Sequence, residues 1–533
     1  MSTQSDPMDE NRSPDQPLPG NDQALSENNA ARENQTPSIE YVLKQPAASL
    51  FAAAIVSLVM AIIFSICFTG IDVLPCVSTT IFTFVTMGAI VILLKKMELE
   101  VNVRGYVWFI PAAVVASMNG IFTLSFFNYT NVFVIFILIT RAVTQVSGVD
   151  MKPFSLDFIG EVFGYIFSVL TDLFPFVKTV FTAASGGRKR TILMILLAVA
   201  VSAPILFIVA LLLLSADSVF YYYADKFLFG ILDDDDMILR IATVIVMFAA
   251  FGGYARHMAV KRERTARRVN PIMIEPIMSG TFLVLLNLLF FLFCAVQVLF
   301  LFTGGFMKLP DGLVYSEYAR EGFFQLLFVT IINFAALLAF LTVINGGQIG
   351  RWINRLLILL CVFTGVLIAS SFYRMTLYIS AYHYTTLRMR VLTFLSMESV
   401  LLIITLAVLL MKRGRARFDF IHAGGMVCLI FYIIVNITGS GYFSDYLNVK
   451  AYKADSGAGI DIYNFSDDGF SFLLELSGDP ELGDDIRRSA RERVVSKRYP
   501  MLDAYDKHWQ NWSLLKSLSD NKIDRFSQEN PEK

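Results

Sequence analysis

The stretch GTFLVLLNLLFFLFCAVQVLFLFT, residues 280–303, decides the class of fold, because it runs for 24 residues without an Asp, Glu, Lys or Arg. A helix needs about 20 apolar residues to cross the roughly 30 Å of hydrocarbon in a bilayer. Backbone groups inside lipid must find hydrogen bonds within the protein, and a helix satisfies them within one segment. Residues 280–303 are therefore predicted to form a transmembrane helix.

Ten more windows share this length and apolar character, so we predict an all-α fold, a polytopic transmembrane helix bundle of about 11 spans. The spans cover residues 48–70, 73–94, 106–126, 128–144, 191–214, 237–255, 280–303, 322–343, 353–373, 394–411 and 419–438. The third and fourth belong to one long run that polar residues 128–131 interrupt. Either of these two is compatible with a short or re-entrant element.

The composition of the whole chain agrees with lipid as its solvent. Of the 533 residues, 55% are hydrophobic and 17% are charged, whereas about a quarter of the residues in soluble domains are charged. The net charge of -1 excludes a protein that binds nucleic acid through its bulk charge. Neutralising phosphates requires a clustered excess of Lys and Arg.

Sequence motifs for catalysis, nucleotides and metals are missing. The chain has no GxxxxGK[ST] phosphate loop, no GxSxG elbow, no HxxxH among its four histidines and no CxxC among its five cysteines. These patterns normally carry phosphate binding, nucleophilic catalysis or metal ligation. We therefore predict no catalytic residue, no metal site and no cofactor, and the balance leans away from an enzyme without deciding the question. The cysteines are interpreted as small buried apolar residues.

Lys and Arg are divided unevenly between the two sides of the predicted bundle. With the N-terminus inside, the inner segments carry 24 Lys and Arg residues and the outer loops carry seven. Because positive loops stay on the cytoplasmic side, we predict a cytoplasmic N-terminus. An odd number of spans then places the C-terminus outside the cytoplasm.

Three parts of the chain differ in composition. Residues 1–46 are polar and lack apolar periodicity, so they are predicted to be a disordered cytoplasmic tail. Residues 47–439 form the predicted bundle. Residues 440–533 hold 17 Asp and Glu against 13 Lys and Arg, which predicts a small soluble helical domain on the outer mouth of the bundle.

An amphipathic inner helix is predicted within residues 155–184. Its polar residues recur every three to four positions, and they are Asp157, Glu161, Tyr165, Ser168 and Asp172. Two placements remain open. The helix either lies along the inner leaflet or docks its acidic stripe on the basic loop at residues 256–268.

Ionisable side chains inside spans are the first candidates for a functional site, because a charge is costly in lipid. Arg320 and Glu321 enter the eighth span, Arg374 leaves the ninth, and Glu398 lies one turn into the tenth. Glu398 needs a partner, and Arg374 or Arg388 is within reach. The group is either a structural ion pair or a polar pocket for a ligand.

Neutral polar residues occupy deeper positions in the spans. They are Asn119, Asn287, Gln297, Asn333 and Asn436. Side chains of this kind hydrogen-bond to neighbouring helices at a modest gain in free energy. We interpret them as contacts between helices in preference to ligands of a conducted ion.

Three passages resemble an uncharacterised family. They are YSEYAREGFFQLL (residues 315–327), SFYRMTLYISAYHYTTLRMRV (residues 371–391) and HWQNWSLLKS (residues 508–517). They are similar to motifs of the bacterial multi-pass membrane proteins called domain of unknown function 4173, which is related to family 4153. That family has Tyr-Gly-Leu-Thr after its Arg-containing loop, whereas this chain has YHYTT at residues 382–386, so it resembles a divergent member.

The resemblance covers about residues 190–520 and implies a multi-pass protein of the bacterial inner (cytoplasmic) membrane, with no established reaction. It also implies that residues of the outer face act as one cluster. Together with Glu398, the resulting ligand-binding candidates are Tyr318, Arg320, Glu321, Arg374, Tyr378, Arg388 and Glu398.

Three hypotheses of function follow. The first is a non-enzymatic membrane protein that binds, senses or translocates a small or lipid-like ligand at the outward-facing Arg/Glu/Tyr cluster. The second is an outward-facing, lipid-linked sugar transferase, although its acidic residue would be Asp72 in a loop of two or three residues. The third is an envelope scaffold that contacts a partner protein through residues 440–533. In each case, anionic lipids of the inner leaflet are predicted to contact the basic segments 256–268 and 412–417.

Overall fold

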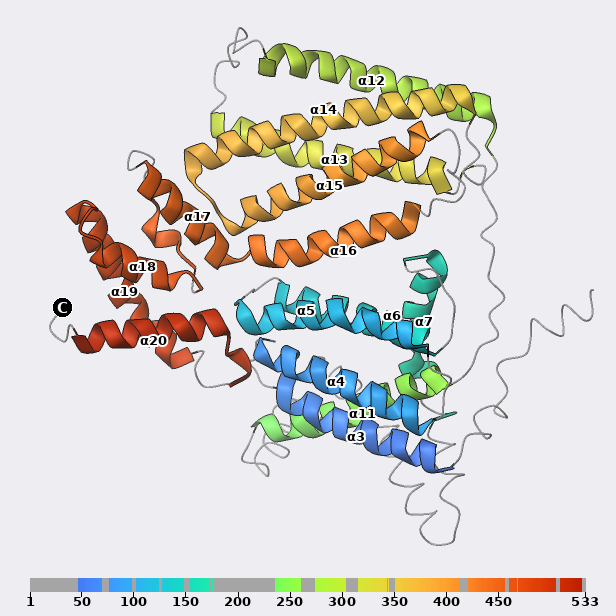
Figure 1. Ribbon diagram of the computed structural model, residues 1–533, viewed down its shortest axis with the longest axis vertical. Helices are drawn as coiled ribbons and strands as arrows, with labels where there is room; N and C mark the ends of the chain where they lie inside the picture. Colours follow the sequence, from blue (N-terminus) through green and yellow to red (C-terminus); the bar gives the residue numbers. More distant parts are fainter. Residues whose placement is uncertain are drawn as a thin grey trace, which may run out of the picture.

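The computed structural model places its elements in one elongated helical assembly (Figure 1). It describes residues 47–69, 76–97, 102–123, 127–147, 154–172, 175–176, 235–259, 274–302, 315–342, 344, 350–411, 420–455, 460–466, 468–504 and 509–529. Every regular element within these ranges is a helix. The predicted span 191–214, the loop residue Asp72, the segment 412–417 and most of the basic loop 256–268 lie outside the described residues.

Seven of the described helices are long and apolar enough to cross a membrane. They are α4 (Val77–Lys96), α6 (Phe127–Val146), α11 (Asp235–Ala259), α12 (Pro276–Phe302), α14 (Arg351–Tyr382), α15 (Thr386–Leu410) and α16 (Phe420–Thr438). The chain is therefore an integral membrane protein built as an all-α bundle.

Three further helices coincide with predicted spans. They are α3 (Ala47–Phe68), α5 (Phe109–Ile121) and α13 (Tyr315–Thr342). Helix α5 has 13 residues and ends at Ile121, so it is shorter than the roughly 20 residues of a full span. The total of 11 spans stays a prediction.

The spans pack in two groups. In the first group, α3, α4, α5, α6 and α11 surround one buried apolar core with the short helix α7 (Leu156–Thr171). In the second, α12, α13, α14 and α15 share another core. Close approach within the second group depends on Gly280, because a methyl group there would overlap the ring of Trp352 on α14. Helix α16 lies between the groups and contacts α15 on one side and α5 on the other.

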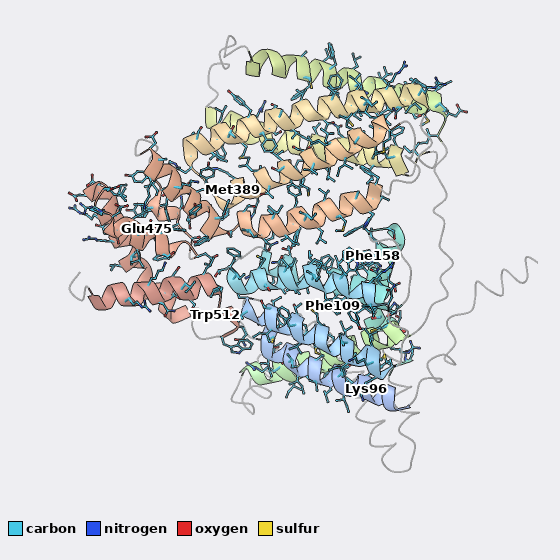
Figure 2. All side chains as sticks on the ribbon, viewed as in Figure 1. Lys96, Phe109, Phe158, Met389, Glu475 and Trp512 are labelled. Carbon is cyan, nitrogen blue, oxygen red and sulfur yellow. The ribbon has the colours of Figure 1, made fainter. Side chains whose placement is uncertain are left out.

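The described helices run back and forth, so their ends gather at two opposite ends of the assembly. Figure 2 shows Lys96 and Phe158 at one end and Met389, Glu475 and Trp512 at the other. The assignment of the Lys96 end to the cytoplasm stays a prediction of the charge pattern.

The C-terminal residues form shorter helices beyond the second end of the spans. They are α17 (Gly441–Ala454), α18 (Phe470–Gly478), α19 (Asp484–Ala504) and α20 (Leu514–Glu529). Buried residues of α17, α18 and α19, among them Val449, Leu473 and Val494, make a separate apolar core. This segment is joined to the first group by hydrogen bonds, in which the Val77 amide donates to the Trp512 carbonyl at 3.2 Å and Gln510 donates to the Ile66 carbonyl at 2.9 Å.

Candidate functional site

Helices α13, α14 and α15 carry all seven residues that the sequence proposed for a ligand site, and α14 packs against both of the others. Tyr318, Arg320 and Glu321 lie near the beginning of α13, where the structure describes the helix but not these side chains. The other four side chains are described. The structure thus brings the three helices together, and it describes side-chain contacts for only part of the predicted cluster.

Glu398 is the most deeply buried ionisable residue of this group, at 2% exposure. Helix α15 begins at Thr386, where the Thr385 hydroxyl accepts the Arg388 amide as an N-cap. Because this start precedes the predicted window, Glu398 lies 12 residues into the helix, or about 18 Å along it. The carboxyl group therefore sits near the middle of the span and not one turn from its end.

The hydroxyl of Thr330 on α13 is the partner that the described residues give to Glu398. It lies 2.9 Å and 3.1 Å from the two carboxylate oxygens. The sequence had suggested Arg374 or Arg388 as an ion-pair partner, and the structure does not pair either with Glu398. A carboxylate buried inside a membrane bundle with one neutral hydrogen-bond donor is costly. The protonated form or the approach of a cationic group lowers that cost.

A second buried acceptor lies one turn along α13. The side-chain nitrogen of Asn333 donates to the Thr364 hydroxyl of α14 at 3.1 Å. The Thr364 hydroxyl in turn donates to the backbone carbonyl of Leu360. The side-chain oxygen of Asn333 is buried without a hydrogen-bond partner. Thr330 and Asn333 share one face of α13 because they are three residues apart. The three helices thus enclose a polar region that is rich in acceptors.

Arg388 is engaged by the turn between α14 and α15. Its guanidinium group donates to the carbonyl oxygens of Tyr382 and His383, which are end groups of α14. The same group lies over the Tyr378 ring, 4.1 Å from the ring centroid, a cation–π geometry. His383 has a φ of 65°, a strained conformation for a non-glycine residue. Arg388 and Tyr378 therefore stabilise this turn.

Arg374 lies on α14 between this turn and Glu398. It is 5% exposed and is eight residues, or about 12 Å, from the end of its helix. Since α14 and α15 are antiparallel neighbours, Glu398 lies about 6 Å deeper than Arg374. A positive and a negative group thus lie at different depths of the bundle.

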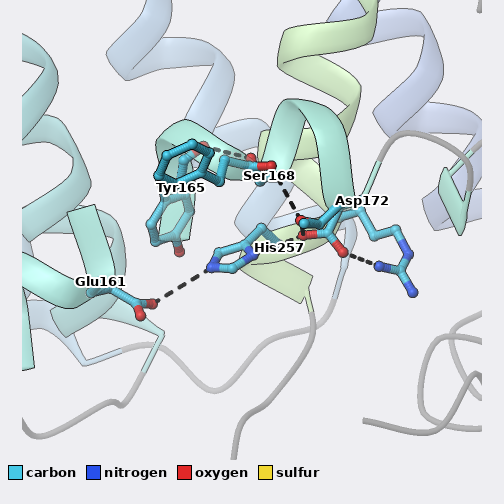
Figure 3. A network of polar contacts seen from close by, with 8 residues as sticks. Glu161, Tyr165, Ser168, Asp172 and His257 are labelled. Carbon is cyan, nitrogen blue, oxygen red and sulfur yellow. Dashed lines mark hydrogen bonds and ion pairs between the residues drawn. The ribbon is translucent and has the colours of Figure 1, made fainter. Parts of the chain in front are cut away.

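A charged network that sequence analysis did not resolve joins α7 to α11 (Figure 3). Asp172 forms an ion pair with Arg256 and lies 2.9 Å from the Nδ1 atom of His257. On the other side of the ring, Nε2 lies 3.9 Å from Glu161. All four side chains are buried, and the ring of Tyr165 meets that of His257 edge-on at 4.5 Å.

This network shows that the polar face of α7 packs against α11. The acidic stripe docks on a basic partner, as one of the two sequence interpretations had it, and the described partners, Arg256 and His257, are the first residues of the predicted segment 256–268 and lie in the last turn of α11. The opposite face carries exposed apolar side chains, including Phe163 and Phe167. Contact of that face with the inner leaflet, the other interpretation, is compatible with this arrangement.

A third polar network joins α5, α6 and α16. The side-chain nitrogen of Asn131 donates to the side-chain oxygens of Asn119 at 2.5 Å and of Asn436 at 2.8 Å. The Tyr432 hydroxyl donates to Asn131 at 2.6 Å. Asn128 donates to the Cys76 sulfur at 3.3 Å. Asn119 and Asn436 are thus contacts between helices, as interpreted from the sequence, whereas residues 128–131 had been taken as an interruption.

Comparison with known proteins gives one match. A family model described as domain of unknown function, DUF4153, matches residues 109–476. The matched residues extend from α5 to α18 and include the polar region of α13–α15. No curated protein and no solved structure matches the chain. The match is to family 4153, which the sequence passages had suggested as a relative, and membership in family 4173 stays a prediction.

Proposed function

Because the chain belongs to the DUF4153 family, whose function is unknown, we propose a function from its geometry: it binds a small or lipid-like ligand between α13, α14 and α15 and senses or translocates it. The proposed environment is the bacterial inner membrane, with the Arg374 end of these helices facing away from the cytoplasm. The excess of Lys and Arg in the predicted inner segments supports this orientation.

The observation that carries the proposal is the isolation of the Glu398 carboxyl group. It is 2% exposed, near the middle of a span, with the Thr330 hydroxyl as its described partner. Ionisable side chains inside a membrane mark ligand or ion pathways by default. In a purely structural ion pair, a Lys or Arg side chain would contact the carboxylate. Among the described residues, no cationic side chain forms an ion pair with Glu398.

The chemistry of the region indicates the class of ligand. Glu398 and the open oxygen of Asn333 are acceptors, so the inner part of the ligand should donate hydrogen bonds or carry a positive charge. Arg374, about 6 Å nearer the helix ends, suits an anionic group. A zwitterion of the size of a phosphoethanolamine headgroup matches this order of charges, either free or on a lipid.

Thermal unfolding of the full chain in phosphatidylcholine nanodiscs tests the proposal. Ethanolamine and phosphoethanolamine are expected to raise the Tm of the wild type, because both carry an amine that can reach Glu398. Inorganic phosphate alone should have little effect. In Glu398→Gln, which keeps the shape and loses the charge, the amine-dependent rise should disappear.

Glu481→Gln is the matched control, since Glu481 is exposed in the C-terminal segment. It should respond to the amines as the wild type does. An equal rise of Tm in wild type and Glu398→Gln would contradict the proposal, as would the absence of any rise with either amine in the wild type.

A further inference from the structure

Four helices of the first group, α3, α4, α6 and α11, line a partly open apolar cavity of about 300 Å³. Its wall includes a cluster of four Phe rings. Phe82 is the centre of this cluster, with ring centroids 5.4 Å from Phe64, 5.4 Å from Phe68 and 6.1 Å from Phe251. Because the rings pack against one another, they support the wall and leave the cavity open.

The cavity is lined by five hydroxyl-bearing side chains, Ser57, Thr79, Thr83, Thr86 and Tyr254. The Tyr254 hydroxyl lies 3.5 Å from that of Thr140, and Thr79 has a partner as well. Thr83 and Thr86 donate to carbonyl oxygens of their own helix, at 2.7 Å each. Ser57 of α3 also lines the cavity and is 1% exposed. Its hydroxyl has no hydrogen-bond partner. The cavity thus presents one unsatisfied polar group on an otherwise apolar surface, and such a buried hydroxyl is costly.

Two simple occupants leave this cost in place. A buried water needs two to four polar partners, and among the described lining side chains Ser57 is the one whose polar atom lacks a hydrogen bond. A hydrocarbon chain fills the apolar space but leaves the hydroxyl unpaired. An occupant with a hydrocarbon body and one oxygen satisfies both requirements.

We propose that this cavity binds a lipid-soluble molecule that consists of a hydrocarbon chain with a single hydroxyl or carbonyl oxygen, and that this oxygen hydrogen-bonds to Ser57. The walls belong to helices that cross or line the membrane interior, so the surrounding bilayer supplies apolar molecules directly. The cavity is separate from the α13–α15 region, and its occupancy does not depend on the function proposed there.

Photolabelling in nanodiscs tests the proposal with two probes, a diazirine-bearing dodecanol and a diazirine-bearing dodecane. Labelled peptides are identified by mass spectrometry. One hydrogen bond of ordinary strength corresponds to roughly a tenfold preference in binding. Peptides that line the cavity in α3 and α11 should therefore be labelled by the alcohol about tenfold more efficiently than by the hydrocarbon.

Ser57→Ala should abolish this preference for the alcohol. Ser78→Ala is a matched control, because Ser78 is also fully buried with an unpartnered hydroxyl and does not line the cavity. The preference should survive in this control. Equal labelling by the two probes in the wild type, or a preference that persists in Ser57→Ala, overturns the assignment.

Filling the cavity provides a second test that does not depend on Ser57. Ala250→Phe enlarges a residue of the wall and should lower labelling of the lining peptides by both probes several-fold. Ala369→Phe makes the same change at an exposed position of α14 and should leave labelling unchanged. Unaltered labelling in Ala250→Phe, with the protein folded as judged by its Tm, overturns the proposal.

Discussion

The side-chain amide of Asn448 pairs with both backbone polar groups of Tyr384. The Tyr384 amide donates to Asn448 Oδ1 at 2.8 Å, and Asn448 Nδ2 donates to the Tyr384 carbonyl at 2.9 Å. Asn448 belongs to α17, and Tyr384 lies in the turn between α14 and α15. This pairing attaches the C-terminal helices directly to the turn beside the proposed ligand region.

Asn448→Ala removes both of these hydrogen bonds and should destabilise the protein by about 2 kcal/mol, at about 1 kcal/mol for each bond. The measurement is urea unfolding, together with hydrogen exchange of the 383–388 amides, which should become faster. Asn464→Ala is the control, since Asn464 bonds to Asp461 on an exposed surface. Unchanged exchange at the turn in Asn448→Ala would show that the pairing does not hold it.

The Asn131–Asn436 contact predicts energetic coupling between α6 and α16. Hydrogen bonds between membrane helices contribute about 0.6 kcal/mol on average and at most about 1.7 kcal/mol. A double-mutant cycle of Asn131→Ala and Asn436→Ala should give a coupling energy in this range. A cycle that pairs Asn131→Ala with Asn287→Ala, on α12 of the other group, should give none. Additivity in the first cycle would contradict the contact.

The Asp172–Arg256 ion pair predicts unequal effects of single and double substitutions. Asp172→Ala leaves Arg256 and His257 without this carboxylate in a buried site, which should cost about 3 to 5 kcal/mol. Asp172→Ala combined with Arg256→Met should cost less than Asp172→Ala alone, because the buried charge is removed as well. Chemical unfolding measures both, and limited proteolysis reports whether α7 detaches. A double variant less stable than the single one would contradict this prediction.

The ion pairs of Lys453 predict that the stability of the C-terminal helices depends on pH. Its ammonium lies 2.7 Å from Glu475 and 3.4 Å from Asp479, and the hydrogen bond with Glu475 is the main cause that raises the Lys453 pKa. A raised pKa in the folded state stabilises at pH values below the ordinary lysine pKa of about 10.4. This gain in stability is lost as the pH rises through the raised pKa that Lys453 has in the folded protein.

Lys453→Met should therefore cost a few tenths of a kcal/mol, and at most about 1 kcal/mol, at neutral pH and low salt, since the pair is partly exposed. The loss should shrink at high salt and vanish at strongly alkaline pH. Lys450→Met, on an exposed position of the same helix, should show neither dependence. A cost that is the same at neutral and alkaline pH would rule out the ion pair as its source.

The sequence predicted the class of fold because lipid imposes a rule on each segment separately. Whether residues 280–303 can cross a bilayer depends on their own length and polarity, and a helix lies there. The partners of polar residues depend on how helices pack, which no single segment contains. Arg388 was expected near Glu398, but it binds the carbonyl groups of its own turn.

The polar networks between α7 and α11 and among α5, α6 and α16 likewise depend on how helices pack, which the sequence of one segment does not contain. The period of Glu161 and Asp172 predicted a polar helix face, while their contact with Arg256 and His257 across about 90 residues of sequence follows from tertiary packing. Asn131 looked like an interruption because a polar residue lowers local hydropathy. In the folded chain it is the residue that binds both Asn119 and Asn436.

The position of α16 has a consequence for how the polypeptide can be divided. Leu429 and Asn436 are the buried residues of this 19-residue helix within the described structure, and amide side chains connect it to α5 and α6. The two groups of helices each have an apolar interior of their own. We expect a chain cut between α11 and α12 to yield two fragments that insert independently and reassemble in one bilayer, joined by the Asn131–Asn436 contact and by the hydrogen bonds of Trp512 and Gln510 with α4 and α3.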